Sequence, residues 1–167
     1  MSEPQTFTPE LLPRQGERNA WLLALAATIG LLLIRTWAIV PTWVWVFIGF
    51  LYFSALSISL GNWMDRRTRL TLSPEGVAYE NGLRHARLMW EDIEQVRVSP
   101  ARWGRRVEVI GKRAHFSFET LGEVHFRGQV RGYTGFAQGE AILNSILETA
   151  GLRQTIRQDA LTIYTRS

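Results

Sequence analysis

A run of 44 residues, 21–64, carries only one charged side chain, that of Arg35. An α-helix needs roughly 20 apolar residues to cross the hydrocarbon core of a bilayer, so the run is long enough for two crossings. Pro41 interrupts it near the middle, because proline lacks a backbone N–H and its ring clashes with the preceding turn. The sequence therefore predicts a transmembrane hairpin, with helices over 20–40 and 43–64 joined by a tight turn at the proline.

Two other interpretations of this run fit less well. Helices that are apolar on every face lie in a membrane or in the core of a large protein, and 167 residues amount to about one domain. A cleaved signal peptide begins with a basic segment, whereas Glu3, Glu10 and Glu17 precede this run. Interfacial tryptophans also favour the membrane, because five of the seven lie in or beside the predicted helices: Trp21, Trp37, Trp43, Trp45 and Trp63.

Arginines flank the apolar run on both outer sides and predict its orientation. Arg14 and Arg18 precede the first helix, and a second group follows the other helix. Basic residues favour the cytoplasmic side, so we expect both termini in the cytoplasm and two passes through the inner (plasma) membrane or an equivalent one. Arg35 can snorkel to the outer headgroups, or it can contact a partner or a lipid phosphate. The predicted membrane-interface residues are Arg35, Arg66, Arg67 and Arg69.

The remainder of the chain is polar and predicts a mainly β domain. Side chains alternate between apolar and polar after Arg69, which is typical of strands, and Asn81-Gly82 favours a hairpin turn. Seven short strands are predicted: 69–72, 77–80, 83–90, 93–98, 107–109, 114–119 and 124–127. The period then changes to that of an amphipathic helix over 139–150, with Gly151 as its C-cap.

The two ends of the chain are predicted to lie outside this domain. Residues 1–19 contain three prolines, mixed charge and few apolar side chains, so we expect a mostly disordered arm. The segment 152–167 is a polar tail except for 161–164, which can form a short strand or pair with a partner. The predicted layout is an arm at 1–19, the hairpin at 20–64, a β domain at 65–151 and a tail at 152–167.

Two segments carry a family resemblance. Residues 70–77 read LTLSPEGV, and residues 90–96 read WEDIEQV, of the form W-x-D-I-x-x-V. Followed by the predicted helix, they resemble the bacterial pleckstrin-homology-like (PH-like) domain of small membrane proteins over about 68–151. The resemblance implies seven strands with a C-terminal capping helix, a binding or scaffold role, and no catalytic residues. In the motif, Trp90 can cover an open end of the sheet and Asp92 can accept backbone N–H bonds.

The loop 73–76 differs from the corresponding loop of the PH domains that bind phosphoinositides. Those domains carry several basic residues between their first two strands, whereas 73–76 is short and acidic here. The departure argues against a phosphoinositide pocket in that place.

Other chemistry is not expected. The three histidines, His85, His115 and His125, lack a third ligand at a spacing that suits a metal. The glycine-rich stretch 122–139 lacks the Gly-Lys-Ser/Thr ending of a phosphate loop, so loops and turns are expected there. The absence of cysteine excludes disulfides, thiolate metal sites and cysteine nucleophiles. We therefore predict no catalytic residues, no cofactor, no metal and no enzymatic activity.

Basic residues gather around the loop 100–104 and the hairpin that follows it, with Trp103 at the loop tip. Residues 65–151 hold 13 basic and 11 acidic groups, so any basic patch is local. A solvated face with ordinary ion pairs is one interpretation, and contact with anionic headgroups or an acidic partner is the other. Nucleic acid is not expected, since no extended basic groove is indicated. The candidate binding residues are Arg97, Arg102, Trp103, Arg105, Arg106, Lys112 and Arg113.

These observations predict a membrane-anchored PH-like module on the cytoplasmic face. Its expected partners are membrane lipids, with anionic headgroups in particular, and a protein, and a homo-oligomer is compatible with the sequence. The alternative is an assembly or stabilisation factor, or an accessory subunit, of a larger membrane complex that uses the hairpin as its contact surface.

Overall fold

The computed structural model describes residues 3–158 and 160–166. Its contacts divide the chain into two compact units. One unit is Pro13–Met64, and the other combines Met1–Leu12 with Asp65–Ser167. The apolar run thus lies inside the sequence of a discontinuous β unit.

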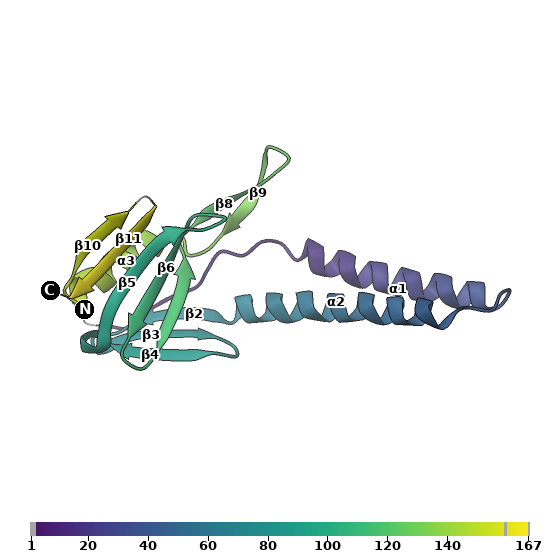
Figure 1. The fold of residues 1–167 in the computed structure, drawn as a ribbon, viewed down its shortest axis with the longest axis horizontal. Helices are drawn as coiled ribbons and strands as arrows, with labels where there is room; N and C mark the ends of the chain where they lie inside the picture. Colours follow the sequence, from purple (N-terminus) through teal and green to yellow (C-terminus); the bar gives the residue numbers. More distant parts are fainter. Residues whose placement is uncertain (1–2, 159, 167) are drawn as a thin grey trace. The chain divides into compact units, whose positions relative to one another are not determined.

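Two antiparallel helices, α1 (Gln15–Arg35) and α2 (Thr42–Arg66), form the first unit (Figure 1). Pro41 directly precedes α2, where it removes no helical hydrogen bond. By length and composition both helices could cross a bilayer. The prediction of two long apolar helices is confirmed, although α1 begins at Gln15 and therefore includes part of the arm that the sequence predicts to be disordered.

A polar network joins the two helices near the start of α1. The Glu17 carboxylate accepts hydrogen bonds from Ser59 Oγ at 2.9 Å and from Asn62 Nδ2 at 2.8 Å. Ser59 Oγ in turn accepts one from Trp21 Nε1 at 2.9 Å, and the Trp21 ring meets Tyr52 edge-on at 6.0 Å. Such interhelical hydrogen bonds fix the register of a helix pair. Trp21 thus has a contact role that its position near a helix end did not indicate.

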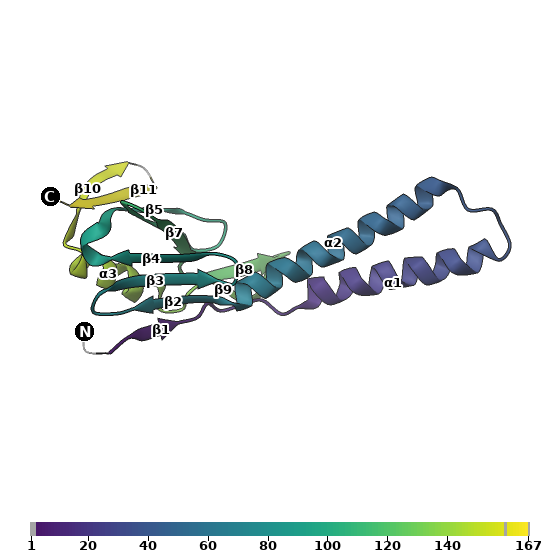
Figure 2. The same cartoon turned by 90° about the horizontal axis from the view of Figure 1, so that it is seen from below.

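Two alanines, Leu31 and Ile48 are the buried side chains of the two helices, whereas most of the large apolar side chains face outward. Ala24 and Ala55 are completely buried. The two helices run side by side as a hairpin (Figure 2), and the outward side chains are exposed along both of them. In α2 they include Trp43, Trp45, Val46, Phe47, Phe50, Phe53, Leu56, Ile58, Leu60 and Trp63.

The β unit contains two larger antiparallel sheets, one separate two-stranded sheet and a helix. The first sheet has the order β1-β2-β3-β4, formed by β1 (Gln5–Phe7), β2 (Thr68–Leu72), β3 (Gly76–Asn81) and β4 (His85–Met89). The second has the order β10-β11-β5-β6-β7, formed by β10 (Leu152–Gln158), β11 (Leu161–Arg166), β5 (Ile93–Pro100), β6 (Arg105–Gly111) and β7 (His115–Glu119). The third pairs β8 (Gly122–Phe126) with β9 (Gln129–Thr134).

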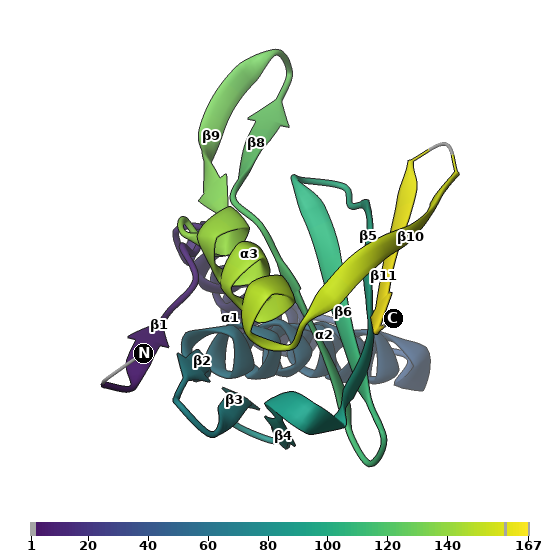
Figure 3. The same cartoon turned by 90° about the vertical axis from the view of Figure 1, so that its left-hand side faces the viewer.

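The core lies between the two larger sheets and the helix α3 (Gly139–Thr149), which packs against them (Figure 3). Strand alternation produces it, because every second side chain points inward. Val77 of β3, Val107 of β6 and Ile142 of α3 are completely buried. Phe118 and Phe136 meet edge-on at 5.7 Å and close the core beside α3.

The prediction of seven strands is wrong, because residues 3–158 and 160–166 contain eleven. β1 lies in the predicted disordered arm and pairs with β2 through Gln5↔Leu72, Thr6↔Thr71 and Phe7↔Leu70. β9 lies in the glycine-rich stretch. β10 and β11 form a hairpin from the predicted tail, which therefore belongs to the β unit. A distant strand stabilises this tail, because β11 pairs with β5.

The motif at the start of β5 also anchors the tail. Trp90 is 8% exposed, and its Nε1 donates to the carbonyls of Ser73 at 3.0 Å and Pro74 at 3.1 Å, consistent with the predicted covering role. The Asp92 carboxylate forms an ion pair with Lys112, and the Asp92 carbonyl accepts a hydrogen bond from Lys112 N at 3.1 Å. The guanidinium of Arg166 donates to the carbonyl of Trp90 at 2.8 Å and to those of Glu91 and Ala150.

Candidate functional site

The loop between β5 and β6 carries Trp103 and is held tightly by its surroundings. A Cβ on Gly122 would lie 2.4 Å from the carbonyl carbon of Trp103, so only glycine fits at the start of β8. Gly104 has a φ of +74°, which favours glycine. The Thr120 hydroxyl accepts a hydrogen bond from Arg105 N at 3.0 Å. The predicted site is therefore part of a rigid loop.

Two of the predicted arginines are paired with carboxylates of other elements. Arg105 Nε donates to Glu140 Oε1 of α3 at 3.1 Å, and its Nη2 contacts the second oxygen of the same carboxylate. Arg106 Nη2 donates to Glu119 Oε1 of β7 at 2.8 Å. The hydrogen bond from Arg106 to Glu119, together with the carboxylate charge, raises the pKa of the guanidinium. These two charges are compensated within the β unit.

Neither Arg97 nor Arg102 has such a contact with a carboxylate of the described residues. Arg97 Nε donates to Gln95 Oε1 at 3.2 Å, and in the sheet register Arg97 lies opposite Glu108 of β6. The guanidinium of Arg102 lies 5.2 Å from the ring centroid of Trp103, a distance suited to a cation–π contact. Around this loop, Arg102 and Trp103 are the pair that remains available to a ligand.

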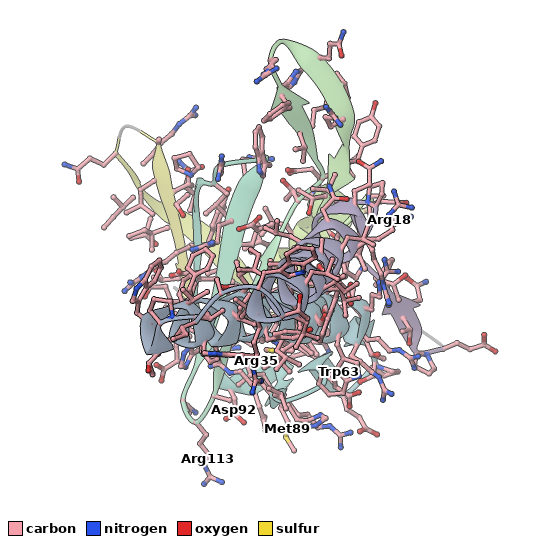
Figure 4. The ribbon with its side chains drawn as sticks, turned by 90° about the vertical axis from the view of Figure 1, so that its right-hand side faces the viewer. Arg18, Arg35, Trp63, Met89, Asp92 and Arg113 are labelled. Atoms are coloured by element: carbon pink, nitrogen blue, oxygen red, sulfur yellow. The ribbon has the colours of Figure 1, made fainter. Side chains whose placement is uncertain are left out.

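Lys112 and Arg113 lie at the other end of β6. At about 3.4 Å per residue, this strand separates them from Arg105 by roughly 20 Å. Lys112 Nζ lies 3.8 Å from Asp92 Oδ1, and Arg113 extends outward from the turn between β6 and β7 (Figure 4). The structure therefore divides the seven predicted residues between two places.

A cavity of about 580 Å³ adjoins this second place. Besides Lys112 and Arg113, its lining includes Arg84, Glu108 and His115. Arg84 Nη2 donates to the His115 carbonyl at 3.0 Å and lies 3.0 Å from its Nε2. The lining carries several basic side chains and one acid. Two of the basic residues, Arg84 and His115, already contact each other.

The predicted membrane-interface arginines are exposed. Arg35 ends α1, Arg66 ends α2, Arg67 connects α2 to β2, and Arg69 lies in β2 on the side opposite to the buried Leu70. Their positions are compatible with contacts to headgroups.

A further cavity, of about 330 Å³, is lined by Tyr79, Arg106 and Glu119 among others. The Tyr79 ring stacks on Phe116 at 5.4 Å. Burial raises the pKa of the Tyr79 phenol, and hydrogen bonds with Thr68 and Asn81 partly oppose this effect.

The described residues include no group of three or more His, Asp or Glu side chains that could hold a metal ion. His85 lies beside Glu80, His125 lies beside Glu123, and His115 contacts Arg84. The expectation that the protein is not an enzyme stays a prediction.

The sequence predicted the strand 124–127, which is β8, but missed its partner β9 and therefore the hairpin that the two form. This hairpin carries a second group of basic and aromatic residues. Phe126, Val130 and Tyr133 are exposed on it, beside Arg127 and Arg131. Its sequence signal is Arg127-Gly128 between residues of alternating polarity. The signal is weak, because arginine replaces the asparagine that is typical of such turns.

Two antiparallel sheets with a C-terminal helix define a mainly β domain, a class used by many binding modules. Residues 67–127 match the family model of the bacterial PH domain, from the start of β2 to the end of β8. This match confirms the resemblance that 70–77 and 90–96 indicate. No curated protein and no solved structure matches the chain. A PH-like domain suggests a binding or scaffold module.

Proposed function

We propose that this protein is a membrane-anchored binding module. In this proposal α1 and α2 cross a bilayer as a hairpin with both termini in the cytoplasm. The PH-like domain then binds a protein partner or anionic lipid headgroups at the inner surface, without catalysing a reaction.

One observation carries the proposal: a helix with exposed apolar side chains leads almost directly into the PH-like domain. α2 ends at Arg66 and β2 begins at Thr68, so Arg67 alone connects them. If α2 spans a bilayer, this connection holds the first strand of the domain within a few ångströms of the surface. Such tethering raises the effective concentration of the domain toward anything at that surface, so modest affinities suffice.

The exposed side chains of both helices support the membrane part of the proposal. Phe47, Phe50 and Phe53 of α2 lie largely exposed, which is unfavourable in water and favourable in lipid. The arginines at Arg66, Arg67 and Arg69 support the cytoplasmic orientation, since basic residues are retained on that side.

Crosslinking of the full chain in its native membrane tests the proposal. The chain has no cysteine, so single cysteines can be introduced at Arg102 in the β5–β6 loop and at Phe50 on α2, each carrying a photoreactive label. We expect the chain to stay in the membrane after alkaline carbonate washing and Arg102→Cys to crosslink to a protein or to lipid.

Release of the chain by carbonate would overturn the membrane anchor. Protein adducts from Phe50→Cys alone would instead favour the assembly-factor alternative, in which the helices form the contact surface. Absence of any adduct at Arg102→Cys in a membrane-embedded chain would contradict binding at this loop.

A further inference from the structure

The β8–β9 hairpin is separate from both larger sheets. In the described part of the chain its two strands pair only with each other, and it extends away from the sheets (Figures 1 and 3). Phe126 pairs with Gln129, so the turn consists of two residues, Arg127 and Gly128. An isolated two-stranded hairpin is marginally stable in water, so exposed apolar side chains on it need an explanation.

The turn places an arginine where arginine is unfavourable. Both central residues have positive φ, 51° for Arg127 and 78° for Gly128, as a type I′ turn requires. In the part of the chain that the structure describes, Arg127 is the only residue other than glycine with positive φ. Strained residues of this kind gather at functional sites, and here the strain presents a charge at the tip.

A β-bulge brings a second arginine to the same tip. The register shifts between Val124↔Gly132 and His125↔Val130, which leaves Arg131 without a residue opposite. The guanidinium carbons of Arg127 and Arg131 lie 5.5 and 5.2 Å from the Phe126 ring centroid. One exposed ring is thus flanked by two cations.

These cations are not compensated. No carboxylate among the described residues forms an ion pair with Arg127 or Arg131, and the acid of the hairpin, Glu123, lies 3.2 Å from His125 Nε2. Phe126 is 53% exposed and Val130 is 51% exposed. The tip therefore combines apolar surface with unpaired positive charge.

We propose that the tip of this hairpin, formed by Phe126, Arg127, Val130 and Arg131, inserts into the headgroup region of an anionic lipid bilayer. The inference rests on the proposed function, because α1 and α2 would hold the domain at a membrane surface. Aromatic rings are favoured at the headgroup level, and the anionic leaflet attracts each nearby arginine.

The size of the tip favours a lipid surface over a protein partner. A stable protein interface buries about 800 Å² on each side, spread over 20 or more residues. A two-residue turn with its flanking side chains offers far fewer residues. A tethered domain needs only weak additional contact with lipid, since the helices already supply the local concentration.

A single fluorescent label at the tip tests the inference on the full chain. Gln129→Cys, the only cysteine in the protein, is labelled with an environment-sensitive dye and reconstituted into nanodiscs. One set contains phosphatidylcholine alone, and the other contains phosphatidylcholine mixed with phosphatidylglycerol. Gln158→Cys, exposed at the end of β10, is the matched control. Quenching by spin-labelled lipids reports depth.

We expect quenching at position 129 in the anionic nanodiscs and little at position 158. Removing each arginine should lower the insertion equilibrium by about fivefold. Arg127→Asn is the sharpest variant, because Asn-Gly suits the type I′ turn better, so the charge is lost while the hairpin is kept. Arg131→Gln provides the second removal, and Arg127→Lys should retain most of the quenching.

Equal exposure of the two labels in anionic nanodiscs would overturn the inference. Quenching at position 129 should fall in neutral nanodiscs and in a variant that combines Arg127→Asn with Arg131→Gln. If it stays at the level of the anionic nanodiscs in both, the role of the arginines is overturned. A photoreactive label can replace the dye at position 129. A crosslink from this label to a protein instead of to lipid would also overturn the inference. If the chain is not embedded at all, the proposed membrane anchor fails, whereas an embedded chain with an exposed tip refutes only the hairpin inference.

Discussion

The β5–β6 loop and the β8–β9 tip hold similar residues in opposite surroundings. Each combines arginines with an aromatic ring. At the loop, Arg105 and Arg106 are paired with Glu140 and Glu119, and the backbone packs closely against β8. At the tip, the arginines have no carboxylate partner among the described residues. The comparison teaches that a local density of arginine in the sequence does not indicate which charges remain available after folding.

The reason lies in the distance along the chain. Glu119 is 13 residues from Arg106, and Glu140 is 35 residues from Arg105. Only the fold brings β7 and α3 to these arginines. The tip contains its own turn and bulge, and within residues 3–158 and 160–166 no acid of another element forms an ion pair with its arginines.

The largest expected effect tests the rigidity of the loop. Gly122→Ala places a methyl group 2.4 Å from the Trp103 carbonyl carbon, so the backbone must shift. We expect the free energy of opening of β6 and β8 to fall by about 1–3 kcal/mol, measured by amide hydrogen exchange of the full chain in detergent.

Gln129→Ala at the exposed tip is the control for this substitution. It should change the same free energies by less than about 0.5 kcal/mol. Equal protection of β6 and β8 in Gly122→Ala and in the unmodified protein would contradict the close packing of the loop.

A smaller effect separates the paired arginines from the unpaired ones. Arg105→Gln and Arg106→Gln should each lower the free energy of unfolding by about 0.5 kcal/mol, since both ion pairs are partly exposed to solvent. Arg131→Gln should leave it unchanged while reducing tip quenching. Denaturant titration measures the free energies of unfolding. Added salt should reduce the loss of stability that Arg105→Gln and Arg106→Gln cause, because salt screens the ion pairs of the unmodified protein. A larger loss for Arg131→Gln would reverse the comparison.

The smallest effect appears at alkaline pH and probes the cavity beside Arg106. Burial raises the pKa of Tyr79, whose phenol ionises near pH 10 in an unfolded chain. Above that pH the folded state binds more protons than the unfolded state, so stability falls as pH rises. Tyr79→Phe should make this decline shallower above about pH 10 and leave the pH dependence below it unchanged. If the free energy of unfolding falls equally steeply with pH in Tyr79→Phe and in the unmodified protein, the Tyr79 phenol does not contribute to the pH dependence.

Much of the fold could be predicted from local patterns. Short segments of the sequence were enough to predict four features: the apolar run, the Asn81-Gly82 turn, the alternating strands and the amphipathic helix α3. The PH-like resemblance also came from short segments. Residues 70–77 contain a turn between two strands, and residues 90–96 begin with the buried Trp90.

Apart from β9, which pairs with the adjacent β8, the elements that prediction missed depend on distant partners. β1 is three residues long and is stabilised by its edge pairing with β2, far along the chain. β10 contains mostly polar residues, whereas for β11 the sequence left a short strand over 161–164 as one of two alternatives. Both are stabilised by the pairing of β11 with β5 and by the hydrogen bonds of Arg166. The candidate site was divided for a similar reason, because Lys112 and Arg105 are close in sequence but lie at opposite ends of one strand.

The connections of the β unit to the helices have a mechanical consequence. Residues 8–14 lead from β1 to α1, whereas Arg67 alone leads from α2 to β2, and β1 and β2 are neighbours in one sheet. Sliding of α1 against α2 would therefore load a ladder of three residue pairs through these two connections. The Glu10 N–H bond to the Gly135 carbonyl, 2.8 Å long, takes up part of that load before β1 does. A pull on α1 would thus break the bond between Glu10 and Gly135 first and the pairing of β1 with β2 afterwards.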